Sequence, residues 1–339
     1  MPRTIPLRNW LNRHLSPQFP DQAFPLAPAS ADASFRRYFR VTLPDGGTRI
    51  VMDAPPAHED CRPFLKVAAL FREAGVHVPE VYAEDLDQGF LLLSDLGTTT
   101  YLEALNDHTA SRLYADANAA LINIQRASRP GVLPEYDHAL LSRELNLFPD
   151  WYLNRHLGLT LDNKQDATLR AIFDKLLTNN LAQPQVFVHR DYHSRNLMVI
   201  EDESRANPGI IDFQDAVYGP MTYDLASLYR DAYISWDEQQ ELDFVIRYWE
   251  KARAVSLPVP ADFHDFYRDY EWMGAQRQLK VLGIFARLCH RDGKDGYLKD
   301  MPLVMAYLRR TCERYLDLRP LARLLDQLEN RQVQTGLTF

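Results

Sequence analysis

A short polar segment between two apolar runs constrains the fold of this chain more than any other feature. The runs are residues 186–188 and 197–200, and the segment between them, residues 189–196, holds two histidines, two arginines, an aspartate and an asparagine. Short apolar runs with polar residues on both sides are typical of buried strands. We therefore expect two strands that hold a charged loop in a fixed place, as a site requires when it must position a metal ion or a reacting hydroxyl.

The composition is that of a globular protein. The chain has 339 residues, 46% of them hydrophobic and 25% charged, which fits one large or two smaller domains. The net charge of −8 argues against a general affinity for nucleic acid, because such binding needs a basic face. The three cysteines form no CxxC pair, and no apolar stretch is long enough for a signal peptide or a transmembrane helix. We expect a cytoplasmic protein that binds neither nucleic acid nor membranes.

The first 95 or so residues are expected to be rich in strands. Apolar residues at helical spacing predict helices at residues 5–15 and 62–74, the second ended by Gly75. Residues 34–55 read as a hairpin, because PDGG at 44–47 is a strong turn signal between two alternating segments. Two further strands are expected at residues 81–82 and 89–93.

From Thr98 onward the pattern becomes mainly helical, and the boundary is expected near residues 94–97. The expected helices are residues 100–127, 139–157, 162–181, 223–232, 237–253, 261–287, 299–315 and 319–329, with a β island at 186–188, 197–200 and 209–212. The fold class is therefore α+β, with a small β-rich lobe at residues 1–96 and a larger helical lobe at residues 97–339. In the long helix, Lys280 and Arg287 are expected to face solvent.

Three side chains in and after the polar loop have the chemistry of a metal site. Asp191 and Asn196 lie five residues apart, and Asp212 follows the next apolar run. Oxygen ligands of this kind suit Mg²⁺, which also binds substrate phosphates. A carboxylate that does not bind the metal can orient a hydroxyl and take its proton, and these are the parts needed for phosphoryl transfer. An Asp–Asn pair alone is more often part of a turn, so the co-occurrence with Asp212 carries the prediction.

Two motifs give the chain a family resemblance. HxDxxxxN at residues 189–196, followed by IDF at 211–213, resembles the paired signature of kinase-like folds. The chain resembles the aminoglycoside phosphotransferase/choline kinase-like family, which has the bilobal protein-kinase fold. The segments FLLLSDLG (90–97), LNLFPDWYL (145–153) and DAVYGPMTYDLASLYRD (215–231) extend the resemblance over most of the chain.

The resemblance implies a role for each motif residue. Asp191 is similar to the catalytic base, and Asn196 and Asp212 are similar to the ligands of Mg²⁺. His189 and Asp224 are similar to residues that support the loop and do not touch substrate. ATP would be the phosphate donor, with its adenine against the hinge-like residues Ser94, Asp95 and Leu96.

The chain departs from the protein-kinase pattern where the phosphates of ATP are bound. The third strand has Met52 and Asp53 where a lysine is expected, and residues 29–39 contain no glycine. Arginine binds phosphate through two N–H groups, so Arg36 and Arg37, with Ser34 nearby, are candidate ATP ligands. Charged residues on strands are also commonly exposed to solvent, and the sequence leaves both readings open.

A narrower resemblance concerns the acceptor. SADASFRRYFRV and the segments around the two motifs resemble bacterial kinases of cell-wall recycling that phosphorylate the anomeric C1 hydroxyl of N-acetylmuramate and N-acetylglucosamine. His193 and Arg195 would then meet the carboxylate of the sugar or the phosphate, and Asp215 and Tyr218 would meet sugar hydroxyls. Ordinary loop and turn positions remain an alternative for these four residues.

Two other functions stay open at this point. A kinase of the same family for choline or an aminoglycoside would need an acidic or aromatic acceptor pocket, because those substrates are cations. A pseudokinase that binds nucleotide without chemistry is suggested by the missing lysine. The intact Asp191, Asn196 and Asp212 argue against a pseudokinase, and we expect a monomeric, active sugar kinase.

Overall fold

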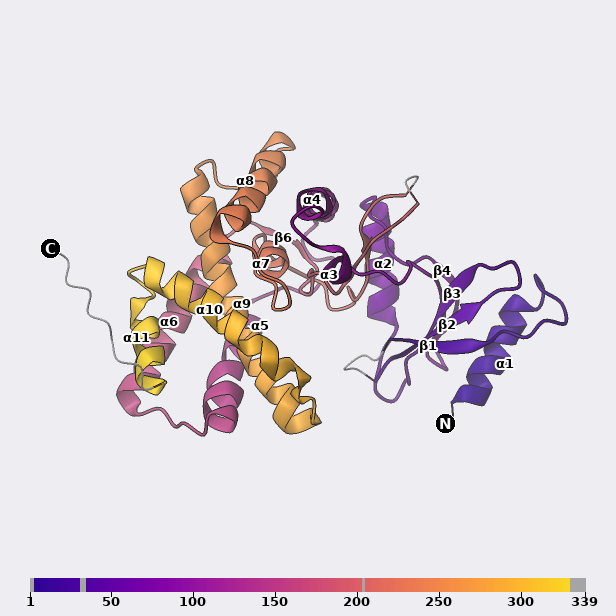
Figure 1. The fold of residues 1–339 in the computed structure, drawn as a ribbon, viewed down its shortest axis with the longest axis horizontal. Helices are drawn as coiled ribbons and strands as arrows, with labels where there is room; N and C mark the ends of the chain where they lie inside the picture. The colour runs from indigo at the N-terminus through magenta and orange to yellow at the C-terminus, as the bar shows by residue number, and fades with distance from the viewer. Residues whose placement is uncertain (1–2, 31–34, 203–204, 330–339) are drawn as a thin grey trace. The chain divides into compact units, whose positions relative to one another are not determined.

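The computed structural model describes residues 3–30, 35–202 and 205–329, and it divides the chain into two units (Figure 1). The first unit contains residues 1–104 and 196–215, and the second contains residues 105–195 and 216–339. The chain therefore passes from one unit to the other inside the polar loop, between Arg195 and Asn196.

The first unit is built on a five-stranded antiparallel sheet with the strand order β1-β2-β3-β5-β4. The hairpin of β2 and β3 pairs Thr42 with Thr48 around the predicted turn, in which Gly46 has a φ of +85°. The strands are β1 (Leu26–Ser30), β2 (Arg37–Thr42), β3 (Thr48–Asp53), β4 (Val81–Asp85) and β5 (Phe90–Ser94). The predicted hairpin and strands are confirmed. Strand β1 was not predicted because Pro28 interrupts its pattern, and proline is tolerated there because β1 is an edge strand.

Two helices of the first unit match their predictions. Helix α1 (Thr4–Leu15) places Trp10 and three leucines in one cluster with apolar residues of the sheet, such as Val51 and Phe90. Helix α2 (Arg62–Glu73) buries one apolar face and ends before Gly75, which has a φ of +78° that glycine adopts without strain. Both helices follow from apolar residues at helical spacing.

The first unit also contains residues that follow the polar loop. Strands β7 (Leu197–Met198) and β8 (Gly209–Ile210) pair with each other, and short bridges join them to Thr100 and His77. The N–H of Ile210 donates to the carbonyl oxygen of His77 at 2.8 Å. Residues 196–215 thus group with the N-terminal part of the chain, which the sequence division at residue 96 did not anticipate. The assignment of nucleotide binding to one part and sugar binding to the other stays a prediction.

The second unit is helical around one small sheet. Strand β6 (Gln185–Val188) pairs with β9 (Val217–Pro220), a strand that was not predicted from the sequence. The helices are α4 (Ala110–Arg126), α5 (His138–Leu145), the π-helix η1 (Phe148–His156), α6 (Asn163–Ala182), α7 (Tyr223–Tyr229), α8 (Glu238–Ala254), α9 (Phe263–Asp292), the 3₁₀-helix η2 (Asp295–Asp300), α10 (Met301–Arg314) and α11 (Arg319–Leu328).

Two of the predicted helices are each interrupted. The segment 100–127 forms α3 (Tyr101–Ala104) and α4, because the side chain of Asn106 accepts hydrogen bonds from the N–H groups of His108 and Thr109. Such local bonds compete with the helical pattern. The segment 139–157 forms α5 and η1, with Pro149 in the first turn of η1, where proline is tolerated.

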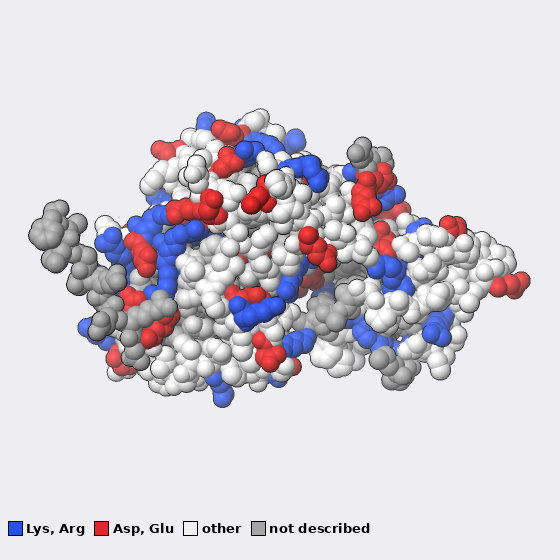
Figure 2. All heavy atoms as spheres, in the orientation of Figure 1, with Lys and Arg blue, Asp and Glu red and all other residues white. Residues whose placement is uncertain are grey.

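Helix α9 is the central element of the second unit. It packs against α6, α7, α10 and η1, and most of its residues between 270 and 286 are buried (Figure 1). Gly283 allows η1 to approach, since a Cβ there would lie 2.4 Å from the carbonyl carbon of Leu147. Among the described residues no helix combines the length and apolarity that crossing a bilayer requires. Acidic and basic side chains are interspersed over the face shown in Figure 2.

Candidate active site

The backbone on the N-terminal side of Asp191 is held by two predicted support residues. Asp224, at the start of α7, accepts hydrogen bonds from the N–H groups of His189 at 2.7 Å and Arg190 at 3.0 Å. The N–H of Asp191 donates to Nδ1 of His189 at 3.2 Å. Both side chains are buried and contact the loop itself, as residues that position a neighbour would.

Arg190 holds a strained conformation directly before Asp191. Its φ of +79° lies in the left-handed region, which costs a non-glycine residue about 1–3 kcal/mol. The guanidinium is fixed by Glu144 of α5 at 2.6 Å and lies 5.5 Å from the centre of the Tyr136 ring. These contacts stabilise the turn that presents the Asp191 side chain.

The carboxyl of Asp191 is surrounded by positive charge. Burial alone would raise its pKa, but Lys280 and the neighbouring His193, His189 and Arg190 bring the pKa below its usual value. Asp191 is therefore ionised at neutral pH and able to accept a proton or a hydrogen bond. A carboxylate in this state fits the predicted role of a base that orients a hydroxyl.

Lys280 corrects one prediction made from the sequence. It was expected to face solvent, but its side chain on α9 is only 7% exposed. Its ammonium lies 3.0 Å from Glu144 and donates to the hydroxyl of Tyr223 at 2.8 Å. The prediction was wrong because α9 is covered on nearly all sides, so a polar residue at helical spacing did not mark an exposed face.

Glu144 contacts both cations near Asp191, and no motif marked it as a site residue. Its carboxylate accepts from Arg190, from Lys280 and from the hydroxyl of Tyr136. Burial would raise the pKa of Glu144, but the charges of Lys280 and Arg190 outweigh this and lower it. The carboxylate therefore stays ionised and compensates part of the positive charge.

The C-terminal side of the loop is organised around Asp231 and Tyr233, which follow α7. Asp231 accepts from the N–H and the hydroxyl of Ser194, and from the N–H of Tyr233 at 3.1 Å. The guanidinium of Arg195 lies 3.6 Å from the centre of the Tyr233 ring, and the ring of His193 meets it edge-on at 5.6 Å. Burial lowers the pKa of His193, although the charges of Asp231 and Asp191 favour its protonated form. The predicted substrate residues His193 and Arg195 thus share one aromatic neighbour.

The other two predicted substrate residues lie in different settings. Tyr218 is part of β9, where its backbone pairs with Pro134 and Tyr136 at 2.7 Å, and its ring meets Phe187 edge-on. Asp215 is exposed at the C-terminal end of the first unit's second segment. Their sugar-binding role stays a prediction.

In the first unit, the two predicted metal ligands lie side by side. Nδ2 of Asn196 is 3.4 Å from Oδ2 of Asp212, and the N–H of Ile211 donates to the carbonyl oxygen of Asn196 at 3.1 Å. Asp212 has a φ of +62°, and Gln214 donates to its Oδ1 at 2.8 Å. One amide and one carboxylate fit Mg²⁺, which takes one or two carboxylates and completes its shell with waters and phosphates. No cluster of three or more His, Cys, Asp or Glu side chains suited to a metal occurs in the described part of the chain.

The predicted phosphate ligands include arginines that contact carboxylates. Arg37 pairs across the hairpin with Asp53, whose other side is bound by Arg3 at 2.8 Å. Arg36 lies 3.7 Å from Glu59. Ser34 lies outside the described residues. Met52 and Asp53, one of which stands where a lysine was expected, are both buried.

The hinge-like residues are held by short polar contacts. Oγ of Ser94 accepts from the N–H of Glu80 at 2.8 Å. Asp95 accepts from Arg40 and from the N–H of Gly97, and Leu96 is buried. Burial would raise the pKa of Asp95, but the hydrogen bond from Arg40 and other donors keep it below its usual value. A cavity of about 270 Å³ is lined by residues 95–99 and 199–202 with His77 and Arg205.

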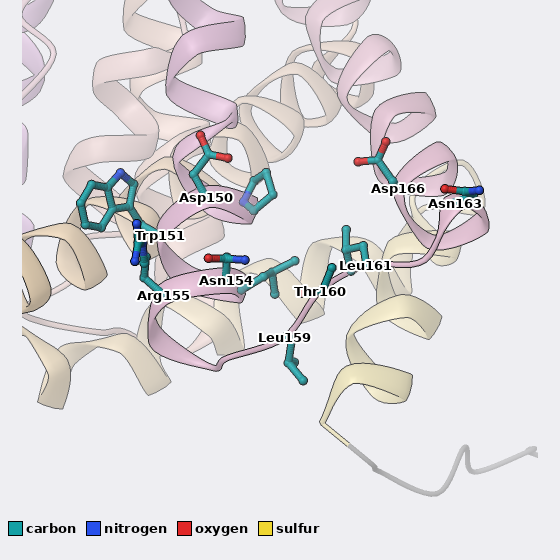
Figure 3. Close-up of a pocket in the computed structure, with 11 residues that line it drawn as sticks. Asp150, Trp151, Asn154, Arg155, Leu159, Thr160, Leu161, Asn163 and Asp166 are labelled. Carbon is teal, nitrogen blue, oxygen red and sulfur yellow. The ribbon is translucent and has the colours of Figure 1, made fainter.

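A second hollow lies apart from these residues, on the second unit (Figure 3). This groove of about 710 Å³ runs between η1, the following loop and the start of α6. Asp150 on η1 and Asp166 on α6 stand on opposite sides of it, and Trp151 and Asn154 also line it. Arg155 also lines it, so its lining carries two negative charges and one positive charge.

The fold and the two motifs are those of a phosphotransferase with a protein-kinase-like fold. Comparison with known proteins agrees with this class. A family model described as "Phosphotransferase enzyme family" matches residues 25–258. The chain belongs to this family. Among solved structures, a putative aminoglycoside phosphotransferase from Ralstonia eutropha superposes with a TM-score of 0.60 at 15% identity, covering 91% of this chain and 98% of the other. A choline/ethanolamine kinase family protein from Mesorhizobium loti gives 0.61 at 14%, covering 95% and 99%. The predicted α+β, protein-kinase-like fold is confirmed.

More similar relatives are known by sequence. An N-acetylmuramate/N-acetylglucosamine kinase of Neisseria meningitidis serogroup B is 51% identical over the whole of both chains. A protein of the same name from Pseudomonas aeruginosa is 54% identical over 89% of this chain and 88% of its own. A third, from Caulobacter vibrioides, is 31% identical over 72% of this chain and 69% of its own. The predicted family is confirmed by these comparisons.

Proposed function

We propose that this chain is an ATP- and Mg²⁺-dependent kinase that phosphorylates the anomeric C1 hydroxyl of N-acetylmuramate and N-acetylglucosamine in cell-wall recycling. One observation carries the proposal: a kinase named for these two sugars is 51% identical to this chain over its full length. The charged loop that holds Asp191 supports a catalytic role, since function must be argued from the site and not from the fold alone.

Asp191 is the proposed base. Its lowered pKa keeps it ionised, so it accepts the proton of the C1 hydroxyl as the sugar oxygen bonds to the γ-phosphorus and the bond to ADP breaks. An anomeric hydroxyl is more acidic than an ordinary alcohol, so a weak base suffices. Catalysis then depends mainly on positioning and charge neutralisation.

Asn196 and Asp212 are the proposed ligands of Mg²⁺, which when bound neutralises charge on the phosphates of ATP. Gln214 holds one carboxylate oxygen of Asp212 and leaves the other toward Asn196. The left-handed backbone of Asp212 fixes where its carboxylate points. The backbone bond between Ile211 and Asn196 keeps the two ligands together.

Arg37 is the proposed replacement for the missing lysine. Protein kinases pair a lysine of the third strand with a glutamate of the next helix, and the lysine binds the phosphates. Here the acid is Asp53 on β3, and the cation is Arg37 directly opposite on β2. The Arg37 side chain stays 32% exposed, so a phosphate can reach its guanidinium, which binds phosphate through two N–H groups. Asp53 is then a positioning residue.

The other predicted contacts complete the proposal. Ser34 and Arg36 would lie near the phosphates, and Ser94, Asp95 and Leu96 would line the adenine. The sugar would contact His193, Arg195, Asp215 and Tyr218. The guanidinium of Arg195 and the imidazole of His193 suit an acceptor that carries a carboxylate. A cytoplasmic monomer suffices for this reaction, because ATP is available there and every proposed residue comes from one chain.

The test is phosphate transfer from γ-labelled ATP with Mg²⁺ to N-acetylmuramate, N-acetylglucosamine, choline and kanamycin. N-acetylmuramate methylated at the C1 oxygen serves as the control. Transfer to the free amino sugars but not to the methyl glycoside is expected, because the methyl group blocks the acceptor oxygen. Transfer only to choline or kanamycin would overturn the sugar assignment and turn attention to the acidic groove in Figure 3. No transfer to any acceptor would favour the pseudokinase.

A further inference from the structure

Arg277 on α9 is a buried cation whose guanidinium is not paired with any carboxylate that the structure describes. Its side chain is 5% exposed, and its Nε is buried without an acceptor. Within the described ranges it forms neither an ion pair nor a hydrogen bond. A buried charge without a partner is strongly unfavourable, so native proteins pair such groups or leave them for a ligand.

Other buried cations of the second unit show how unusual this is. Lys280, three residues further along α9, lies 3.0 Å from Glu144. Arg230 is bound by Glu241 at 2.7 Å and by Glu271 at 2.6 Å. The helical bundle thus neutralises its buried cations with its own carboxylates. Arg277 is an exception, which points to an anion supplied from outside the chain.

The surroundings of Arg277 identify where that anion would lie. Arg277 acts electrostatically on His193 and Tyr233, beside the C-terminal side of the catalytic loop. Arg195 stacks on the same Tyr233 ring at 3.6 Å and, like Arg277, forms no ion pair with the described residues. Nδ1 of His193 is buried without a partner. Arg195 and His193 therefore meet at one aromatic ring, and the charge of Arg277 acts on both that ring and His193.

In the described part of the chain, the nearby carboxyl groups form no ion pair with Arg277 or Arg195. Asp231 is occupied by Ser194 and by the N–H of Tyr233. Asp224, whose pKa the charge of Arg277 lowers, accepts from the N–H groups of His189 and Arg190. Asp300 and Asp191 also face this region electrostatically, which favours one bound anion over several. An arginine presents a planar pair of N–H groups that matches a carboxylate.

We propose that Arg277, together with Arg195, binds the carboxylate of the lactyl group of N-acetylmuramate and thereby sets the preference between the two sugars. N-acetylglucosamine has no such group, so the two proposed acceptors differ in one negative charge. The inference rests on the proposed function, because it concerns the acceptor of that reaction. The transferred phosphate is the competing anion, and the experiment separates the two.

The experiment compares wild type with Arg277→Met on three acceptors: N-acetylmuramate, its lactyl carboxamide and N-acetylglucosamine. For N-acetylmuramate, kcat/KM should fall about 10- to 100-fold, mainly through KM, because hydrogen bonds to a charged group contribute roughly 1.5–3 kcal/mol. For the amide and N-acetylglucosamine, kcat/KM should fall less than about threefold. The variant should therefore have similar kcat/KM values for the acid and the amide. Arg277→Lys should recover part of the loss on N-acetylmuramate.

Arg287→Met is the matched control, since Arg287 lies on the same helix and is partly buried. It should leave the ratio of the two sugars unchanged. An equal fall in kcat on both sugars for Arg277→Met would assign Arg277 to the phosphate and overturn the proposal. If Arg277→Met does not fold, the wild-type protein still tests the proposal. Equal wild-type kcat/KM values for N-acetylmuramate and its lactyl carboxamide would overturn it. Absence of transfer to either sugar by wild type would instead defeat the proposed function.

Discussion

Asp53 on β3 lies buried between two arginines, whereas Arg277 on α9 lies buried and forms no ion pair with a described carboxylate. In the sheet of the first unit, the protein itself supplies the counter-charge, so the orientation of Arg37 is set before any ligand binds. In the second unit, the counter-charge of Arg277 is missing within the described residues.

The difference teaches how to read a buried charge. A paired cation contributes to stability, and its removal leaves the partner uncompensated. An unpaired buried cation costs stability. Its removal therefore should not destabilise the fold, but it should weaken the binding of the ligand. Substitutions that break a buried ion pair should therefore lower the free energy of unfolding. Substitution of the unpaired cation should instead change the kinetic constants.

The largest expected effect is on turnover, at the carboxylate of the charged loop. Asp191→Asn should lower kcat about 10³-fold, because it removes the group that accepts the hydroxyl proton. The thermal midpoint and the Kd for ATP should change little, since the loop backbone is held by His189 and Asp224. Steady-state kinetics and calorimetric ATP titration measure both. Turnover within tenfold of wild type would remove Asp191 from the role of base.

A large loss of stability is expected at Glu144, the partner of two cations. Glu144→Gln should destabilise the protein by about 3 kcal/mol, because Arg190 and Lys280 both lose their buried counter-charge. Thermal unfolding followed by circular dichroism measures the change. The double variant with Lys280→Met should recover part of the loss.

Arg277→Met provides the matched contrast in the same assay. We expect its thermal midpoint to equal or exceed that of wild type, since an unpaired buried charge is replaced by an apolar side chain. A loss as large as that of Glu144→Gln would break the comparison between paired and unpaired cations.

A smaller effect is expected at Arg37, which forms an ion pair with Asp53 and is also the proposed ligand of the ATP phosphates. Arg37→Met should raise the KM for ATP about tenfold, the size of one lost charge-assisted hydrogen bond. Asp53→Asn should raise it less and also lower the thermal midpoint, because Arg3 and Arg37 lose their buried partner. Arg49→Met is the control, since Arg49 on β3 packs on the ring of Tyr82. An unchanged KM for ATP in Arg37→Met would assign the phosphates to other donors.

The sequence predicted what is local and missed what is assembled from distant segments. Asp191, Asn196 and Asp212 fall in short motifs next to apolar runs, so their positions could be predicted from spacing alone. Glu144 and Arg277 come from α5 and α9, which lie far from the loop in sequence. No pattern in one segment reports a contact between segments.

Two misses had physical signals of opposite kinds. Lys280 resembled a solvent-facing charge because an amphipathic helix normally exposes its polar residues, and α9 is instead covered on nearly all sides. The pairing of Arg37 with Asp53, by contrast, follows from the hairpin register once Thr42 is placed opposite Thr48. The turn prediction located the hairpin but not this register, so the ion pair was not predicted.

The smallest expected effect is a pH dependence at Asp224. Burial raises the pKa of Asp224 to about 7, although its hydrogen bonds from His189 and Arg190 favour the charged form. The folded state therefore holds this proton more tightly than the unfolded state, so its contribution to stability is full below about pH 4 and declines up to about pH 7. The thermal midpoint of wild type relative to Asp224→Asn should fall across that range and level off above it. Because the charge of Arg277 lowers the pKa of Asp224, Arg277→Met should move the upper limit to higher pH. A difference that stays constant from about pH 4 to 7 would show that folding does not raise the pKa of Asp224.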